Sequence, residues 1–402
     1  MTSGFFRSAL ILALMSAVGP LAIDMYLPAL PAIEAGLGAT VAEVQLTLTF
    51  YFLAFGVAQL IYGPLADRYG RKPPIYIGLT IFALGSVLAA VAPDAGWLAA
   101  ARFVQGLGGA ALMVVPRAII RDMHTGNEAT RLMALVMLVI SVSPMLAPLG
   151  GSGLLALFSW RAIFWFFVAA SVLCLIVAAT LQPETLKPEN RRPIEIGTMV
   201  EGAGVLFRSA SFMGLTMVGA FSIGSFFVFI ATAAFVYSEQ YGLTPTGFSI
   251  AFAINAVGFF SGSQLAAPAG MRFGMIRVMR TAIIGFAVFA CLLAGLAATM
   301  DLSLAVVVGL LFAGNFCLGF VVPTTMVMAL DDHGEIAGLA SSLGGTIQMV
   351  TGGLIVALAG PFLDGTVAPM TATIAVCALI ALGLAIWTFT RLSPEGEGAG
   401  QG

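Results

Sequence analysis

Charged residues are scarce in this chain of 402 residues: Asp, Glu, Lys and Arg together make up 9%, whereas hydrophobic residues make up 60%. A water-soluble globular protein typically carries about 25% charged residues, which cover its surface. With so few charges the chain cannot cover itself with a polar shell, so its solvent must be lipid. The sequence also lacks a basic face that could neutralise phosphates, which argues against nucleic-acid binding.

Cysteine is also rare, and no pair of cysteines has the spacing of a metal site. The chain has four cysteines, each alone in an apolar run: Cys174, Cys291, Cys317 and Cys377. Buried free cysteine behaves as a small apolar residue. We therefore expect packing roles for all of them, and neither a metal nor an organic cofactor.

Long apolar runs are what the chain has in abundance. Because a membrane span needs about 20 mostly apolar residues, they predict twelve spans: 8–31, 44–64, 74–92, 98–120, 132–157, 161–181, 211–237, 246–268, 277–299, 302–328, 337–360 and 370–390. Backbone groups in lipid must be hydrogen-bonded internally, so the spans are predicted to be helices. The first run is too long for a signal peptide and lacks a cleavage site, so we interpret it as a retained span.

Lys and Arg fall almost entirely on one side of these spans, with Arg161 near the other. This positive-inside bias predicts cytoplasmic N- and C-termini in a multi-pass protein of the cell inner membrane. The longest polar stretch divides the spans six and six. It predicts a bundle over 1–182, a cytoplasmic linker over 183–208, a second bundle over 209–391 and a disordered tail over 392–402.

A weak internal repeat supports this division. The segment PLADRYG at 64–70 follows the second span, and PAGMRFG at 268–274 follows the eighth, at the equivalent place in the other half. Proline, arginine, an aromatic residue and glycine recur in step, whereas Met271 replaces Asp67. The matching positions favour a duplicated six-span unit.

The stretch from Gly63 to Lys72, which we call the latch loop, joins the second and third spans and reads GPLADRYGRK. A purely electrostatic anchor would explain its cations but neither its acid nor its glycine spacing. The stretch resembles the loop signature of the major facilitator superfamily, G-x-L-x-D-R-x-G-R-K. The resemblance implies an all-α integral membrane fold of twelve helices in two pseudo-symmetric six-helix bundles. It also implies a cytoplasmic latch, formed by Gly63, Asp67, Arg68, Gly70 and Arg71, in which the acid faces a helix N-terminus of the other half.

The fourth span contains Arg102 and Gln105 in the sequence RFVQGLGGA. An arginine in hydrocarbon costs about 2.5–3.5 kcal/mol on the insertion scale, so it needs a partner or a water-filled cavity. The family has the same R-x-x-Q-G pattern, which implies a role for Arg102 in proton coupling. The alternative is an Arg102 side chain that extends to the headgroups at the outer end of the span.

The fifth span combines Pro144, Pro148, Gly150 and Gly151, which predicts a helix bend and a close approach of another helix. It is incompletely similar to the exporter signature of the family, G-x-x-x-G-P-x-x-G-G.

Asp24, in the sequence DMYLPALP, is the one carboxylate well inside a predicted span. Burial disfavours the charged carboxylate, so a carboxyl in this position can exchange protons near neutral pH. We therefore predict that Asp24 and Arg102 couple transport to protons. The alternative is a hydrated Asp24 at the outer mouth, where Pro28 and Pro31 end the helix.

The motif DMYLPALP, together with RAIIRD at 117–122 and WRAIFWF at 160–166, resembles the bicyclomycin/chloramphenicol resistance (Bcr/CflA) branch of the drug:proton antiporters. The resemblance implies efflux of small drug-like or amphiphilic molecules in exchange for protons, driven by the proton gradient. We expect a monomer in the lipid bilayer. We expect a mostly apolar substrate cavity, lined by Tyr26, Tyr51, Gln105, Phe226, Phe227, Asn255, Asn315 and Gln348. In the alternative, the phenylalanines face lipid and the amides join helices.

Other functions compete with drug efflux. A proton-coupled importer or exporter of a small metabolite would share the same fold and latch. A membrane-embedded enzyme would need a metal cluster, a nucleophile–base pair or a phosphate-binding loop with a lysine, and the sequence has no such pattern. A receptor or scaffold without transport is a third alternative.

Overall fold

The computed structural model describes residues 3–123, 126–191 and 193–392. Within these residues, twelve helical segments are long and apolar enough to cross a membrane, which confirms the predicted spans and the all-helical fold. Several spans are longer than predicted, and the second reaches from Val41 to Tyr69. The difference arises because these helices continue into polar segments that a hydropathy pattern assigns to loops.

The described chain forms two compact units. The first contains the residues up to Glu195 together with Ala233–Ala253, and the second contains Ile196–Thr232 and the residues from Ile254 onward. The last residues of α9, a π-helical turn and the first part of α10 thus pack with the first unit.

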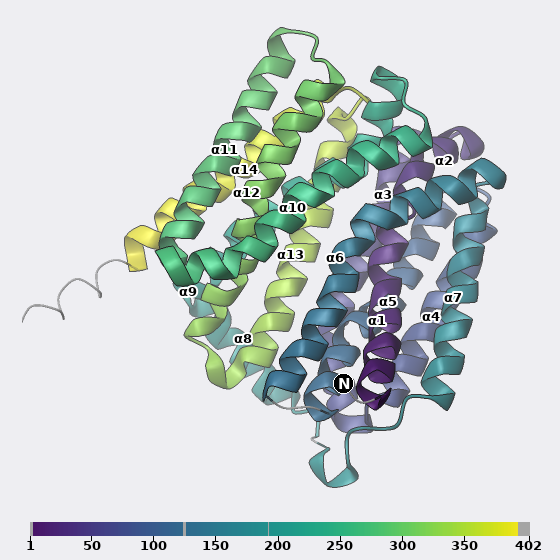
Figure 1. Ribbon diagram of the computed structural model, residues 1–402, viewed down its shortest axis with the longest axis vertical. Coiled ribbons are helices and arrows are strands. Elements are labelled where there is room, and N and C mark those ends of the chain that lie inside the picture. Colours follow the sequence, from purple (N-terminus) through teal and green to yellow (C-terminus); the bar gives the residue numbers. More distant parts are fainter. Residues whose placement is uncertain (1–2, 124–125, 192, 393–402) are drawn as a thin grey trace, which may run out of the picture. The chain divides into compact units, whose positions relative to one another are not determined.

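The first unit is built from helices that follow one another with short connections (Figure 1). They are α1 (Ser3–Asp24), η1 (Leu27–Ala29), α2 (Leu30–Leu37), α3 (Val41–Tyr69), α4 (Lys72–Ala90), α5 (Ala95–Met123), α6 (Gly126–Leu157), α7 (Arg161–Thr180) and η2 (Pro188–Asn190). The start of α3 is stabilised by a capping box. At the start of α3, the Thr40 hydroxyl accepts from the Glu43 amide (3.3 Å) while the Glu43 carboxylate accepts from the Thr40 amide (2.8 Å).

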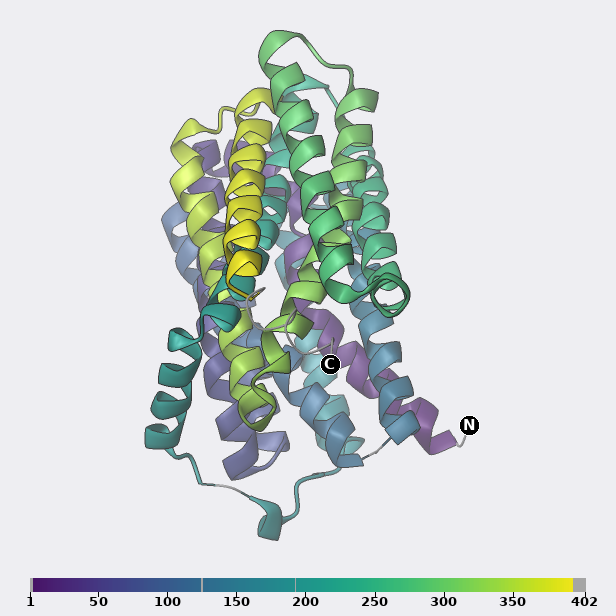
Figure 2. The same ribbon diagram turned by 90° about the vertical axis from the view of Figure 1, so that its left-hand side faces the viewer.

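The second unit contains most of the remaining helices. The elements in chain order are α8 (Ile196–Arg208), α9 (Ala210–Phe235), the π-helix η3 (Val236–Gln240), α10 (Pro245–Phe273), α11 (Met275–Thr299), α12 (Leu304–Asp331), η4 (Gly334–Ile336), α13 (Ala337–Ala359), η5 (Gly360–Phe362) and α14 (Val367–Leu392). Helices α11 and α14 run side by side (Figure 2). The short α8 lies in the segment predicted to be the linker.

The internal repeat has the same local geometry at both of its copies. Gly70 after α3 and Gly274 after α10 both have positive φ angles, of 98° and 85°. Arg68 stacks over the ring of Tyr69 at 5.2 Å, and Arg272 stacks over that of Phe273 at the same 5.2 Å. Positive φ is accessible to glycine without steric strain. The shared turn therefore explains why the two sequence segments match at the glycine, the aromatic residue and the arginine.

The first span is broken near its C-terminal end. It was predicted as one run over 8–31, but α1 ends at Asp24, and the chain continues through η1 into α2, which ends at Leu37. Pro28 and Pro31 cause the break because neither has an N–H to extend the ladder of helical hydrogen bonds. Membrane transporters commonly place binding sites at such broken helices.

Candidate functional site

Asp24 is the last residue of α1, and only 4% of it is exposed. Its Oδ2 atom accepts a hydrogen bond of 3.1 Å from the Ser143 hydroxyl of α6. The break after Asp24 and the packing of α1 against α6 remove the carboxyl from solvent. In this structure the group is thus a buried carboxyl with a hydroxyl partner, not a hydrated one at the mouth of the helix.

Arg102 is fully buried, with 0% exposure, between two tyrosine rings. The centre of its guanidinium lies 4.6 Å from the centroid of the Tyr26 ring and 4.3 Å from that of Tyr51. Its Nη1 donates to Gln105, and the Gln105 amide donates to the Ser86 hydroxyl at 2.8 Å. Its Nε and Nη2 have no hydrogen-bond partner. The tyrosine faces stabilise the charge by cation–π interaction, which strengthens when the cation is desolvated.

Tyr26, Tyr51 and Gln105, which we predicted to line a substrate cavity, thus surround Arg102 in this structure. The Tyr51 hydroxyl donates to the Gly19 carbonyl of α1 at 3.0 Å, and the Arg102 guanidinium lies over the Tyr51 ring. Within the described residues, no ion pair joins Asp24 to Arg102. The role of both residues in proton coupling stays a prediction; Tyr51 connects the surroundings of Arg102 to α1, the helix that ends at Asp24, through its bond to Gly19.

The proline and glycine residues of the fifth span lie in one continuous helix, α6. A side chain at Gly151 would overlap the Met25 carbonyl oxygen, so glycine is what lets α6 approach the break in the first span. On the neighbouring turn, the Ser249 hydroxyl of α10 donates to the Pro148 carbonyl at 2.9 Å within the first unit. The close approach is therefore visible at Gly151, and the bend at Pro144 and Pro148 stays a prediction.

The predicted cavity residues of the second half lie among side chains of the second unit. The Asn315 amide donates to Asn255 at 3.3 Å, and Phe226 stacks on Phe259 with ring centroids 5.2 Å apart. Phe227 packs against Gly352, and the Gln348 amide lies beside Gly219.

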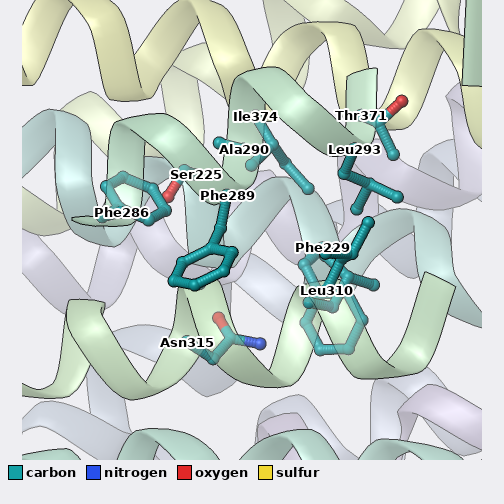
Figure 3. A pocket seen from close by; sticks show the side chains of 12 residues that line it. Ser225, Phe229, Phe286, Phe289, Ala290, Leu293, Leu310, Asn315, Thr371 and Ile374 are labelled. Atoms are coloured by element: carbon teal, nitrogen blue, oxygen red, sulfur yellow. The ribbon is translucent and has the colours of Figure 1, made fainter. Parts of the chain in front are cut away.

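Asn315 also borders a cavity of about 20 Å³ with Ser225, Phe289 and Thr371 (Figure 3). This space is enough for roughly one water, so it is not a drug-sized site. Binding of substrate by these side chains stays a prediction.

The latch loop is an ordered network centred on Arg71. Its guanidinium binds Asp67 at 2.6 Å and Asp122 of α5 at 2.7 Å and 3.1 Å. The Thr185 hydroxyl, from the segment that follows α7, donates to Asp122 at 2.9 Å. Arg68 stacks on its neighbour Tyr69 instead. A side chain at Gly63 would meet no atom within 4 Å, so close packing at Gly63 stays a prediction, as does a contact of Asp67 with the other half.

Glu184 caps the first turn of α4 from outside the helix. Its carboxylate accepts hydrogen bonds from the backbone amides of Arg71 (2.9 Å) and Lys72 (3.1 Å). The next two residues, Pro73 and Pro74, have no N–H, so Glu184 binds the amides at the start of this helix. Gly70 has a positive φ angle, and a side chain there would come within 2.6 Å of the Glu184 carboxylate and displace it from its present position. Partial burial opposes the charged form, but these amides prevail and hold the pKa of Glu184 below its ordinary value of 4.5.

We expect the Glu184→Gln variant to be less stable than the wild type at pH 7. Loss of a helix N-cap typically costs about 0.5–2 kcal/mol. Because the pKa is lowered in the folded state, the contribution of the carboxylate is complete above pH 4.5 and disappears as the pH falls through the lower folded value. Thermal unfolding of purified protein between pH 7 and pH 3 would measure the difference. Glu189→Gln, an exposed acid of the same segment, is the control. An equal gap at every pH would contradict this prediction.

Several of these partners could not be identified from the sequence. Asp122 ends the motif RAIIRD, and Glu184 opens the polar segment, but neither pattern indicates the latch loop as its partner. Ser143 and Ser86 are ordinary hydroxyl residues within spans, and hydropathy does not distinguish them. The one signal available in the sequence was the scarcity of charge. In a chain with so few acids, each acid outside the spans is a candidate for a specific interaction.

The chain matches the model of the Major Facilitator Superfamily over residues 12–357. It is 36% identical to the uncharacterized MFS-type transporter YdgK of Bacillus subtilis, over 95% of both chains. It is 30% identical to the bicyclomycin resistance protein homolog of Haemophilus influenzae, over 98% of both chains. Among solved structures, that of the nucleoside transporter NupG superposes with a TM-score of 0.76, at 14% identity, and covers 95% of this chain and 99% of the other. This protein is a membrane transporter, not an enzyme, and it belongs to the Major Facilitator Superfamily, in the branch that contains the bicyclomycin and chloramphenicol resistance proteins.

Proposed function

We propose that the protein exports small drug-like or amphiphilic molecules across the cell inner membrane in exchange for protons. The observation that carries this proposal is the buried carboxyl of Asp24 in the same unit as the buried guanidinium of Arg102, with no ion pair between them. A buried carboxyl without a cationic partner is stabilised in its neutral form, and it ionises when water or a cation reaches it. A carboxyl with two such environments can load a proton on one side of the membrane and release it on the other.

The names of relatives supply the direction and the substrate class. The bicyclomycin resistance protein homolog and the chloramphenicol resistance protein of Pseudomonas aeruginosa are named for resistance, which export of a drug explains. In the proposed cycle, the bundles 1–182 and 209–391 rock about a central cavity, with the linker 183–208 between them. The termini are cytoplasmic and the protein acts as a monomer. The proton gradient drives transport, so no cofactor is required.

Arg102 has a defined role in this proposal. Its charge is confined by the tyrosine faces and by Gln105, so it stays in place while Asp24 changes protonation. With Asp24 charged, the guanidinium attracts the carboxylate; with Asp24 neutral, that attraction is absent. The electrostatic difference between the two states is what couples proton binding to a change in the packing of α1 and α5.

The test is drug susceptibility of an efflux-deficient bacterium that expresses the protein, with chloramphenicol, bicyclomycin, a sulfonamide and a lipophilic cation as probes. We expect raised resistance and lowered drug accumulation, both abolished by a protonophore. Accumulation of a probe inside energised cells would instead establish an importer. Resistance that persists with the protonophore would contradict proton coupling.

A further inference from the structure

Outside the proposed transport site, a groove with a charged rim lies between α11 and α14 of the second unit. It has a volume of about 250 Å³ and is lined mainly by apolar side chains, among them Ile284, Leu382, Ile386 and Phe389, with Arg280 and Thr390 at one end. Ile284 is 53% exposed and Ile386 is 58% exposed, so the groove opens to the surroundings of the helix pair. For two membrane spans, those surroundings are lipid.

The polar end of the groove is strongly cationic. Arg280 is exposed and stacks over Phe389 at 4.8 Å, which holds its guanidinium over the groove. Arg277 lies one turn earlier on α11, and Arg391 ends α14 and stacks on Trp387 at 4.6 Å. Neither helix carries a carboxylate. None of the three arginines forms an ion pair with a described residue, so the end of the apolar groove is cationic.

We propose that this groove binds one anionic phospholipid, with an acyl chain along the apolar lining and the phosphate at Arg280. The start of α11 and the end of α14 lie on the same side of the membrane as the latch loop, because an even number of spans separates them. In the orientation proposed above, that side is the cytoplasmic leaflet. Arginine forms bidentate hydrogen bonds with phosphate, and basic pockets between spans on this side are suited to anionic headgroups. Shape and charge thus favour a phospholipid over a second protein chain, whose apolar surface would leave the arginines unpaired.

The test is native mass spectrometry of the purified full chain, titrated with phosphatidylglycerol, phosphatidylethanolamine or phosphatidylcholine of identical acyl chains. We expect a single phosphatidylglycerol to bind preferentially. A cation near the membrane surface contributes about fivefold in affinity for an anionic lipid, so we expect Arg280→Gln to weaken binding about fivefold and Arg280→Gln with Arg391→Gln about 25-fold. Ile284→Trp, which fills the exposed part of the groove, should weaken the binding of phosphatidylglycerol without changing the charge.

Arg272→Gln is the matched control, because Arg272 lies on the same side of the same unit and stacks on Phe273 away from the groove. Equal binding of the three lipids, or equal weakening by Arg272→Gln and Arg280→Gln, would overturn the proposal in favour of a general lipid coat. If inorganic phosphate alone displaced the lipid, the groove would be a simple anion site and the proposal would be wrong. If the protein formed a dimer that Ile284→Trp abolished, the groove would bind a second copy of the chain instead of a lipid. These readouts involve no transport, so they fail or succeed independently of the proposed function.

Discussion

Membrane vesicles that contain the Asp24→Asn variant are expected to lose concentrative transport of the probe drug. In everted vesicles with a potential of 100 mV, one proton supplies about 2.3 kcal/mol, enough for an approximately fortyfold gradient of a neutral drug. Asparagine is nearly isosteric with aspartate and can still accept the hydrogen bond from Ser143. It cannot carry a proton, so we expect a final gradient close to one.

Two measurements separate loss of coupling from loss of the fold. The variant should still exchange labelled for unlabelled drug at equal concentrations, because that exchange requires no net proton movement. Asp301→Asn, at an exposed acid between α11 and α12, should behave as the wild type. Undiminished accumulation by Asp24→Asn would move the proton site away from Asp24. Loss of both activities together with loss of folded protein would show a structural role instead.

The largest expected effect on stability is that of Gly108→Val. A side chain at Gly108 would overlap the backbone nitrogen of Phe82 and the carbonyl oxygen of Gly78, where α4 packs against α5. Both obstacles are backbone atoms of a helix, so a change of rotamer does not relieve the overlap. Overpacking of a close-packed interior typically costs about 1–3 kcal/mol, and separation of two helix backbones belongs at the upper end of that range. We therefore expect a marked loss of folded protein.

Fluorescence-detected gel filtration and thermal unfolding would measure this effect. Gly153→Val is the control, because a side chain at Gly153 of α6 meets no atom within 4 Å. It introduces the same side chain into a membrane helix and should leave the yield of monodisperse protein unchanged. If both variants fold as the wild type does, α4 and α5 are not packed as closely as the structure has them.

The α4–α5 packing also bears on the surroundings of Arg102, in the proposed proton-coupling site. Gly108 and Gln105 lie one turn apart on α5, and the Gln105 amide donates to Ser86 of α4. The position of Arg102 therefore depends on the same helix contact that Gly108 permits. A partial loss of that contact would disturb the surroundings of Arg102 as well as the fold.

The sequence by itself determined that this protein lies in a lipid bilayer, how many spans it has, that the spans are helices, and which family it belongs to. These follow from short-range properties: apolar runs long enough to cross lipid, arginines biased to one side, and the unbroken latch loop signature. Asp24, Arg102 and Arg71 stood out for a related reason, since a charge in an apolar run is visible in the sequence itself.

What only the tertiary structure decided is the partner of each of these charges. Ser143 lies 119 residues from Asp24 along the chain, and Asp122 lies 51 residues from Arg71. No periodicity encodes such a pairing, because it depends on which helix faces meet. The contact of the Tyr26 and Tyr51 rings with the Arg102 guanidinium likewise depends on how the first span, α3 and α5 pack together. Charge placement is a property of the chain, whereas charge compensation is a property of the fold.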